Sequence, residues 1–316
     1  MIWIIPAIVA VLTAAFFAIT YYCYKTTFRT KPRPVLAPGE VDIPSGRSFE
    51  PFREQLIQWA LQTRQLPCEE LEMTSFDGLK LHAKYYEYAP GAPVELMFHG
   101  YRSNGERDMS GGVQRCFLLG HSAVVVDQRG CGKSQGKTIS FGIREHRDCL
   151  SWVDFLVQRF GSSVKIILTG ISMGAATVTM AAGRALPENV VGVIADCGFC
   201  SPEEIIRKVI AKKGYPEKAA YWMTKASARI YGGFSLESYS SVEALQTCKV
   251  PVIFVHGEKD QLVPAYMSRK MYEACSSRKK LVSVPGAAHG LSYPVEPERY
   301  LQELREFFGP ELTKDI

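Results

Sequence analysis

Several common signatures of protein function are missing from this chain of 316 residues. Basic and acidic side chains nearly balance, 37 against 32, and a formal net charge of +5 does not indicate nucleic-acid binding. Gly132-Lys133-Ser134 ends like a phosphate-binding loop, but Asp127 stands where the first glycine is required. A dinucleotide-binding motif fails in the same segment, because Gln135 occupies the place of its third glycine. The sequence therefore predicts no nucleotide cofactor.

Cysteine usage points away from a disulfide framework and from a metal site. The nine cysteines are odd in number and scattered, which favours reduced thiols. Cys197 and Cys200 form one C-x-x-C pair, whereas a zinc site of this kind needs a second pair that the chain lacks. We expect neither a metal nor an organic cofactor.

Charge is also absent from the first 24 residues, which are long and apolar enough to cross a bilayer. Trp3 and the pair Tyr21-Tyr22 lie near the two ends, as interfacial aromatics do. A cleaved signal peptide would need a basic segment in front, so a retained single-pass anchor is favoured. Basic residues follow the segment and predict a cell-membrane protein with a cytoplasmic domain, although the reverse orientation stays open; they are Lys25, Arg29, Lys31 and Arg33.

Three parts follow from this organisation. Residues 1–24 are the expected transmembrane anchor, 25–47 a proline-rich basic linker, and 48–316 the folded domain. Apolar residues on one face of 49–64 predict a helix, which packs on the domain or, less favoured, lies on the membrane surface.

Strand and helix patterns alternate through the domain. Residues 70–76 and 80–88 predict an opening strand pair with a turn at Asp77-Gly78. Later segments alternate between short apolar runs and helical patterns, which predicts an α/β fold with a mostly parallel central sheet and helices on both faces. The later expected strands are 94–98, 123–126, 164–169, 190–195, 250–257 and 281–284, and the clearest helices are 144–160 and 298–308.

The strongest motif is G-x-S-x-G at Gly170–Gly174, between an apolar strand and an alanine-rich helix. This turn exposes a nucleophilic serine, here Ser172, next to free N–H groups at a helix N-terminus. Asp260 and His289 lie on loops after the next strands, in the order acid then base that such a serine requires. Glu258 and Asp196 remain alternative acids. The other five histidines fit structural positions: His82 in a strand, His99 in a turn, His121 in a surface turn, His146 in a helix and His256 at a strand end.

An oxyanion hole needs one N–H from the residue after the nucleophile and one from an earlier loop. Met173 and Tyr101, the latter in the turn His99-Gly100-Tyr101, are the expected donors. With the turn Asp127–Ser134, these motifs resemble the α/β-hydrolase superfamily, most closely bacterial membrane-anchored esterases and lysophospholipase-like hydrolases. The resemblance covers roughly residues 66–309 and implies hydrolytic chemistry more strongly than a particular substrate.

Residues 201–240 interrupt the alternation with helical stretches, where the superfamily carries a small helical cap. The segment is basic and amphipathic, which favours an anionic or lipid-like substrate; a solvated helix face is the alternative. The candidate substrate-binding residues are Ile206, Ile210, Trp222 and Met223.

Together these features predict a membrane-anchored serine hydrolase of carboxylic esters, including lipid-like esters such as lysophospholipids or monoacylglycerols. A thioesterase or serine peptidase using the same triad is the alternative, followed by a non-enzymatic binding protein with this fold. The sequence carries no indication of an oligomeric state.

Overall fold

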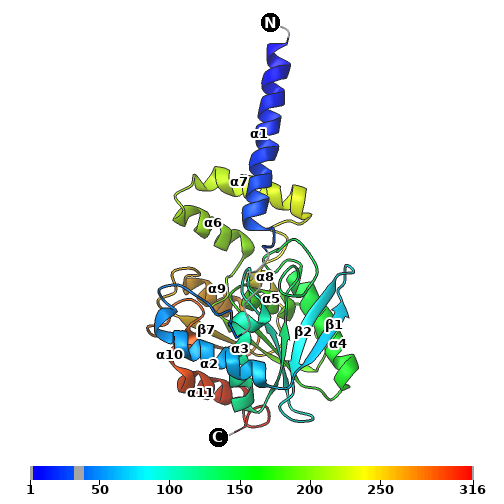
Figure 1. Cartoon of the computed structure of the whole chain (residues 1–316), viewed down its shortest axis with the longest axis vertical. Coiled ribbons are helices and arrows are strands. Elements are labelled where there is room, and N and C mark those ends of the chain that lie inside the picture. The colour runs from blue at the N-terminus through cyan, green and yellow to red at the C-terminus, as the bar shows by residue number, and fades with distance from the viewer. Residues whose placement is uncertain (1–2, 32–38, 315–316) are drawn as a thin grey trace.

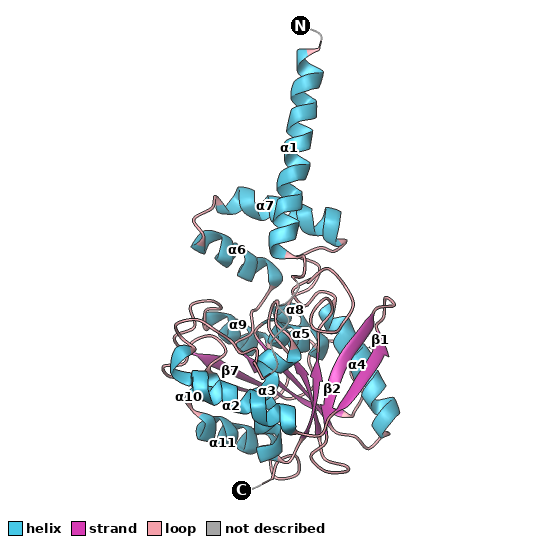
Figure 2. Cartoon of the chain, in the orientation of Figure 1, coloured by secondary structure: helices cyan, strands magenta, loops and turns pink. Residues whose placement is uncertain are grey.

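The computed structural model describes residues 3–31 and 39–314, which form a sheet of eight strands with helices on both faces below a long N-terminal helix (Figures 1 and 2). The strand order is β1-β2-β4-β3-β5-β6-β7-β8. β2 is antiparallel to both β1 and β4, and all other neighbours are parallel, as expected. The strands are β1 Glu69–Thr74, β2 Lys80–Tyr86, β3 Val94–Phe98, β4 Ser122–Val126, β5 Ile166–Ile171, β6 Val190–Asp196, β7 Val252–Gly257 and β8 Lys279–Val284.

Both faces of the central strands are buried, which explains their continuous apolar runs. In β5, Ile166 and Leu168 pack into one core with α4 and α5, whereas Ile167 packs into a second core with α11. The helices that enclose the sheet are α2 Arg53–Gln65, α3 Gly105–Leu119, α4 Glu145–Phe160, α5 Met173–Ala182, α8 Ser241–Leu245, α9 Tyr266–Ala274, α10 Ser292–Val295 and α11 Pro297–Phe308.

The helix expected over 49–64 forms as the short 3-10 turn Glu50–Phe52 followed by α2, and it packs on the domain. Trp59 stacks on Tyr293 with 5.1 Å between ring centroids. Its ring also fills the space above Gly111, where an added Cβ would lie 2.6 Å from it. The interpretation of a domain-packed helix is therefore confirmed.

The expected cap forms between β6 and β7 and stands apart from the sheet, beside the N-terminal helix (Figure 1). It contains α6 Pro202–Lys212, α7 Glu217–Ser227 and the π-helical turn Ala228–Gly232. The Ser201 side chain caps α6 by accepting a hydrogen bond from the N–H of Glu204 at 3.0 Å. The helical structure is interrupted at Gly214 between α6 and α7, where a φ of 75° favours glycine.

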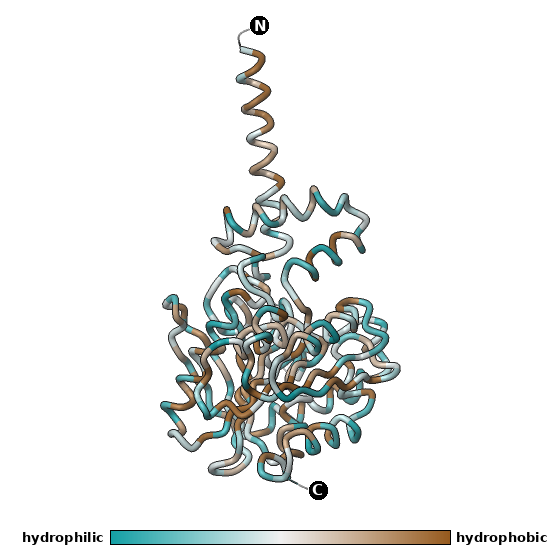
Figure 3. The backbone as a smooth tube through the Cα atoms, turned by 180° about the vertical axis from the view of Figure 1, so that it is seen from behind, coloured by the Kyte–Doolittle hydropathy of each residue, from teal (hydrophilic) through white to brown (hydrophobic). Residues whose placement is uncertain are grey.

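The N-terminal helix α1, Ile4–Thr27, has the length and composition of a membrane span (Figure 3). It ends three residues later than the predicted anchor. The first linker residues also lie against the domain, because Phe28 is fully buried and the N–H of Thr30 donates to the carbonyl of Lys137 at 3.0 Å. The linker residues 32–38 lie outside the described residues.

His146 in α4 is expected to make the domain sensitive to acid. Burial lowers the pKa of His146 to about 4 against an ordinary 6.5, although its bond to the Gly142 carbonyl opposes the shift. The folded state therefore disfavours protonation that the unfolded state accepts, so stability present above pH 6.5 falls until pH reaches about 4. The expected loss is at most about 3 kcal/mol. Urea unfolding of the detergent-solubilised protein across this range measures it, and His146→Gln should flatten the dependence.

Candidate active site

Ser172 occupies a strained turn between β5 and α5. Its φ of 56° lies in the left-handed region that non-glycine residues rarely adopt, and such strain is typical of an exposed nucleophile. The flanking glycines are required by close packing. A Cβ on Gly174 would lie 1.9 Å from the carbonyl oxygen of Phe98, and one on Gly170 would lie 2.2 Å from the backbone of Gly174.

The structure brings Ser172, His289 and Asp260 together from three loops. Nε2 of His289 lies 2.9 Å from Oγ of Ser172, and Nδ1 of His289 lies 2.6 Å from Oδ2 of Asp260. The other carboxylate oxygen of Asp260 accepts from the N–H groups of Leu262 and Val263 at 2.8 and 2.9 Å. The residues thus form a continuous hydrogen-bond chain from carboxylate to hydroxyl.

Asp260 is held ionised by its neighbours. Burial alone would raise the pKa of Asp260, but hydrogen bonds from His256 and His289 outweigh it and hold that pKa well below its ordinary value. His256, expected to be structural, places Nε2 3.2 Å from Oδ2 of Asp260 and 2.8 Å from the Val263 carbonyl. His256 therefore helps to fix the loop that carries Asp260, a role that no sequence motif indicated.

The carboxylates of the two alternative acids bond to residues other than His289. Glu258 accepts a bond from the Ser283 hydroxyl at 2.9 Å, and buried Asp196 accepts from Ser292 and Tyr300 at 3.0 and 3.2 Å.

His121, expected in a surface turn, is fully buried and bonded to Glu95 at 2.9 Å. That surface assignment was wrong, because a buried acid on β3 provides the histidine with a partner.

The turn after β3 lies against the serine. A Cβ on Gly100 would be 3.5 Å from Cβ of Ser172, and the N–H of Gly100 donates to Asp108 at 2.9 Å. Met173 is the first residue of α5, so its N–H has no partner within the helix. Tyr101 follows Gly100 in the turn, and its side-chain hydroxyl donates to the carbonyl of Thr27 at the end of α1, at 2.6 Å.

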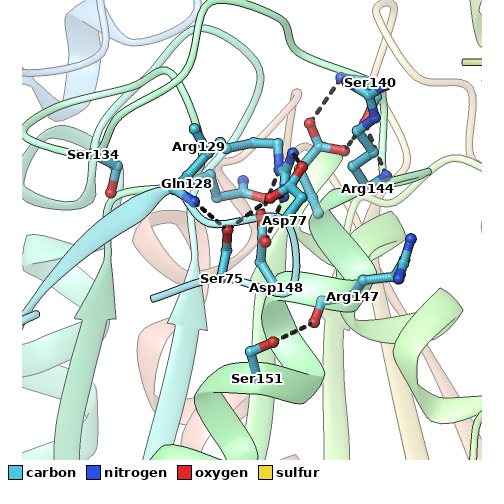
Figure 4. Close-up of polar contacts among 12 residues, drawn as sticks. Ser75, Asp77, Gln128, Arg129, Ser134, Ser140, Arg144, Arg147, Asp148 and Ser151 are labelled. Carbon is cyan, nitrogen blue, oxygen red and sulfur yellow. Dashed lines mark hydrogen bonds and ion pairs between the residues drawn. The ribbon is translucent and has the colours of Figure 1, made fainter. Parts of the chain in front are cut away.

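The turn Asp127–Ser134 contacts the turn after β3 and holds it in place. The Gln128 side chain donates to the His99 carbonyl at 2.6 Å, and the N–H of Gln128 lies 3.0 Å from Nε2 of His99. Next to it, buried Arg129 bridges Asp148, at 2.6 Å, and Asp77, at 2.9 and 3.1 Å (Figure 4). Burial would raise the pKa of Asp77, but the bonds from Arg129 and Ser75 lower it to about 2. The resemblance included this turn, but the sequence did not reveal its contact with His99.

A cavity of about 320 Å³ adjoins Ser172 and His289. It runs between the sheet, α3 and α2, and its lining includes the buried side chain of Arg115. Residues outside the expected cap form its apolar walls; they include Ile43, Pro44, Phe49, Leu56, Trp59, Met109, Tyr293 and Pro294. The sequence did not reveal that positions within residues 43–59, part of which was predicted to be linker, line this cavity.

The four candidate cap residues lie away from this cavity. Ile206 and Ile210 are buried in the main hydrophobic core, and neither they nor Met223 line the cavity. Trp222 is 58% exposed and lies 5.8 Å from Phe16 of α1, centroid to centroid. The structure does not bring these residues to Ser172, because the cap packs against the N-terminal helix.

One group in the described part of the chain has metal-ligand chemistry, with atoms of Cys197, Asp260 and His289 within 4.8 Å of one another. His289 and Asp260 already share a bond of 2.6 Å. Two ligands on one zinc ion, each at about 2.0–2.2 Å, lie farther apart than that in tetrahedral geometry. The observed arrangement fits a proton shared by the pair.

Comparisons with known proteins agree with this fold. Family models match residues 96–213, described as the alpha/beta hydrolase fold, and residues 206–297, described as serine aminopeptidase, S33. The chain has the α/β-hydrolase fold, and these matches support its assignment to the α/β-hydrolase superfamily. The esterase Pf2001 of Pyrococcus furiosus is similar in structure, with a TM-score of 0.64, 18% identity, and coverage of 88% of this chain and 97% of that one.

Two relatives of this chain extend the comparison. The uncharacterized protein YqkD of Bacillus subtilis is 27% identical over 76% of this chain and 80% of its own. An uncharacterized membrane protein of Saccharomyces cerevisiae is 31% identical over 54% of this chain and 55% of its own.

Proposed function

We propose that the protein is a serine hydrolase that cleaves carboxylic esters. Ser172 attacks the ester carbonyl carbon while Nε2 of His289 accepts its proton, and Asp260 stabilises the resulting imidazolium. The N–H groups of Tyr101 and Met173 stabilise the tetrahedral oxyanion. His289 then protonates the departing alcohol, leaving an acyl-Ser172 that water hydrolyses by the same steps. The observation that carries the proposal is the placement of His289 between Ser172 and Asp260.

Ester substrates are favoured because several structural neighbours are esterases. The apolar walls of the cavity suit an acyl chain, so lipid-like esters are included. A serine peptidase is the second candidate, because one matching family model is named for a serine aminopeptidase. Thioesters are chemically accessible to the same nucleophile.

A chain-length series of p-nitrophenyl esters on the full-length protein in detergent tests the ester assignment, with thioester and aminoacyl-p-nitroanilide substrates in parallel. Turnover is expected for esters, with an optimum chain length set by the cavity. Fluorophosphonate labelling without ester turnover would favour the thioester or peptide alternative. Neither labelling nor turnover would favour a non-enzymatic binding protein.

Trp59→Leu is expected to shift the preference toward longer acyl chains by about tenfold in kcat/KM, because each further buried methylene contributes about 0.8 kcal/mol. Trp59 lines the cavity, and a smaller side chain there would extend it. Leu61→Ala on an exposed face of the same helix is the control. An unchanged chain-length profile in Trp59→Leu would place the acyl group elsewhere.

We also propose that α1 anchors the protein in the cell membrane with the catalytic domain in the cytoplasm. The helix carries no charged residue before Lys25 in its last turn, and exposed Arg29 and Lys31 follow its end. The folded domain is then protected from external protease in intact cells and digested in inverted vesicles. The opposite pattern would reverse the orientation.

A further inference from the structure

The cap lies beside α1 (Figure 1). None of its residues lines the cavity next to Ser172. Tyr231 donates a hydrogen bond to the carbonyl of Phe17 at 3.1 Å, and its ring lies 5.4 Å from Tyr21 and 5.7 Å from Tyr24. Trp222 contacts Phe16. The cap and the second half of α1 therefore form one packed unit.

The free part of α1 is too short to cross a bilayer alone. From Ile4 to Phe16, where contact with the cap begins, the helix rises about 20 Å at 1.5 Å per residue, whereas a hydrocarbon core is about 30 Å thick. The remaining thickness must be supplied by the turns of α1 that lie beside α7. A bilayer that holds α1 therefore reaches the level of the cap.

The exposed side chains of α1 at this level agree with that depth. Phe17 and Ile19 are each 47% exposed, and Tyr22 is 64% exposed, although the same helical turns contact Tyr231. Water would be an unfavourable environment for this apolar surface. Lipid can cover the side of α1 that the cap leaves open.

The outward face of the cap has an interfacial composition. Trp222 and Ile230 are 58% and 46% exposed. Lys218, also exposed, lies one helical turn before Trp222, and exposed Arg229 is next to Ile230 in the sequence. Lys225 pairs with Glu237, whereas Lys218 and Arg229 form no ion pair with any described residue. An amphipathic tryptophan flanked by cations suits the boundary between acyl chains and anionic headgroups.

We propose that the face of the cap formed by α7 and the π-helical turn after it inserts into the headgroup region of an anionic lipid bilayer, with Trp222 and Ile230 at the acyl boundary and Lys218 and Arg229 at lipid phosphates. This inference rests on the proposed anchoring by α1. Insertion of the cap would also turn the C-terminal edge of the sheet, where Tyr101 contacts Thr27, toward the membrane. Esters that partition into the bilayer would then be delivered near the catalytic edge.

The test uses the full-length protein in vesicles of phosphatidylcholine and phosphatidylserine, with phosphatidylcholine brominated near the headgroup as a fluorescence quencher. The contribution of Trp222 is the difference between the wild type and Trp222→Phe. Quenching should remove most of that contribution, and Lys218→Glu with Arg229→Glu should restore part of it. Trp59→Phe is the matched control, because Trp59 packs within the domain and its signal should not be quenched.

Trp3, which is 82% exposed near the free end of α1, separates the possible outcomes. Quenching of Trp3 by lipid brominated either near the headgroup or deep in the chains, without quenching of Trp222 by either, would retain the anchor and overturn this inference. If neither Trp3 nor Trp222 were quenched, the proposed anchor itself would be contradicted. Protection of Trp222 from both brominated lipid and aqueous iodide would mean that a second copy covers the cap, which also overturns the inference.

Discussion

Replacement of Ser172 by alanine is expected to lower kcat by more than about 10³-fold while KM changes little. The hydroxyl is the atom that attacks the substrate, whereas the cavity walls and the backbone N–H donors stay in place. The loss should therefore appear in the chemical step. Steady-state kinetics on the best p-nitrophenyl ester measure it.

Ser162→Ala provides the comparison, because Ser162 is exposed in the turn after α4, away from the cavity. Its kinetics should match the wild type. Circular dichroism and unfolding midpoints should show that Ser172→Ala remains folded. Near-normal turnover by folded Ser172→Ala would end the proposed mechanism.

Asp260→Asn is expected to reduce kcat by about 10³–10⁴-fold, because the amide can donate to His289 and favour the wrong imidazole tautomer. The substitution also removes the negative charge that stabilises the imidazolium. The hydrogen bonds from His256 and His289 keep Asp260 ionised in the wild type. Raising the pH should therefore not change the difference in turnover between the wild type and Asp260→Asn.

Glu258→Gln and Asp196→Asn distinguish the candidate acids. Glu258 bonds to Ser283, so its change should leave turnover nearly intact. Asp196 lines the cavity and bonds to Ser292 and Tyr300, so its substitution is expected to act on KM or stability more than on the proton-transfer step. If Glu258→Gln instead abolished activity and Asp260→Asn did not, the acid would have to be reassigned.

The sheet was predictable because its strands carry continuous apolar runs at the spacing of a parallel α/β fold. Ser172, Asp260 and His289 were predictable for a related reason: each follows such a strand, and parallel strands end at one edge of the sheet. The geometry observed among these three side chains matches that expectation. The local sequence pattern was therefore sufficient to predict these three residues of the candidate site.

Contacts between distant segments were not predictable in the same way. The sequence shows that residues 201–240 are helical and amphipathic, but it does not show which surface their apolar side chains meet. Trp222 meets Phe16 of α1, more than 200 residues away, whereas α2 and residues 43–49 line the cavity. Likewise, the Glu95 partner of His121 lies on another strand, so no local signal revealed that histidine's burial.

The most direct test of the central claim is to locate a covalent adduct after the full-length protein reacts with a fluorophosphonate. Only a serine whose proton can pass to a neighbouring base attacks this reagent readily. We predict one adduct, mapped by mass spectrometry to Ser172, absent from Ser172→Ala and strongly slowed in His289→Ala. An adduct on another serine, or no adduct on folded wild-type protein, would contradict the assignment of Ser172 as the nucleophile.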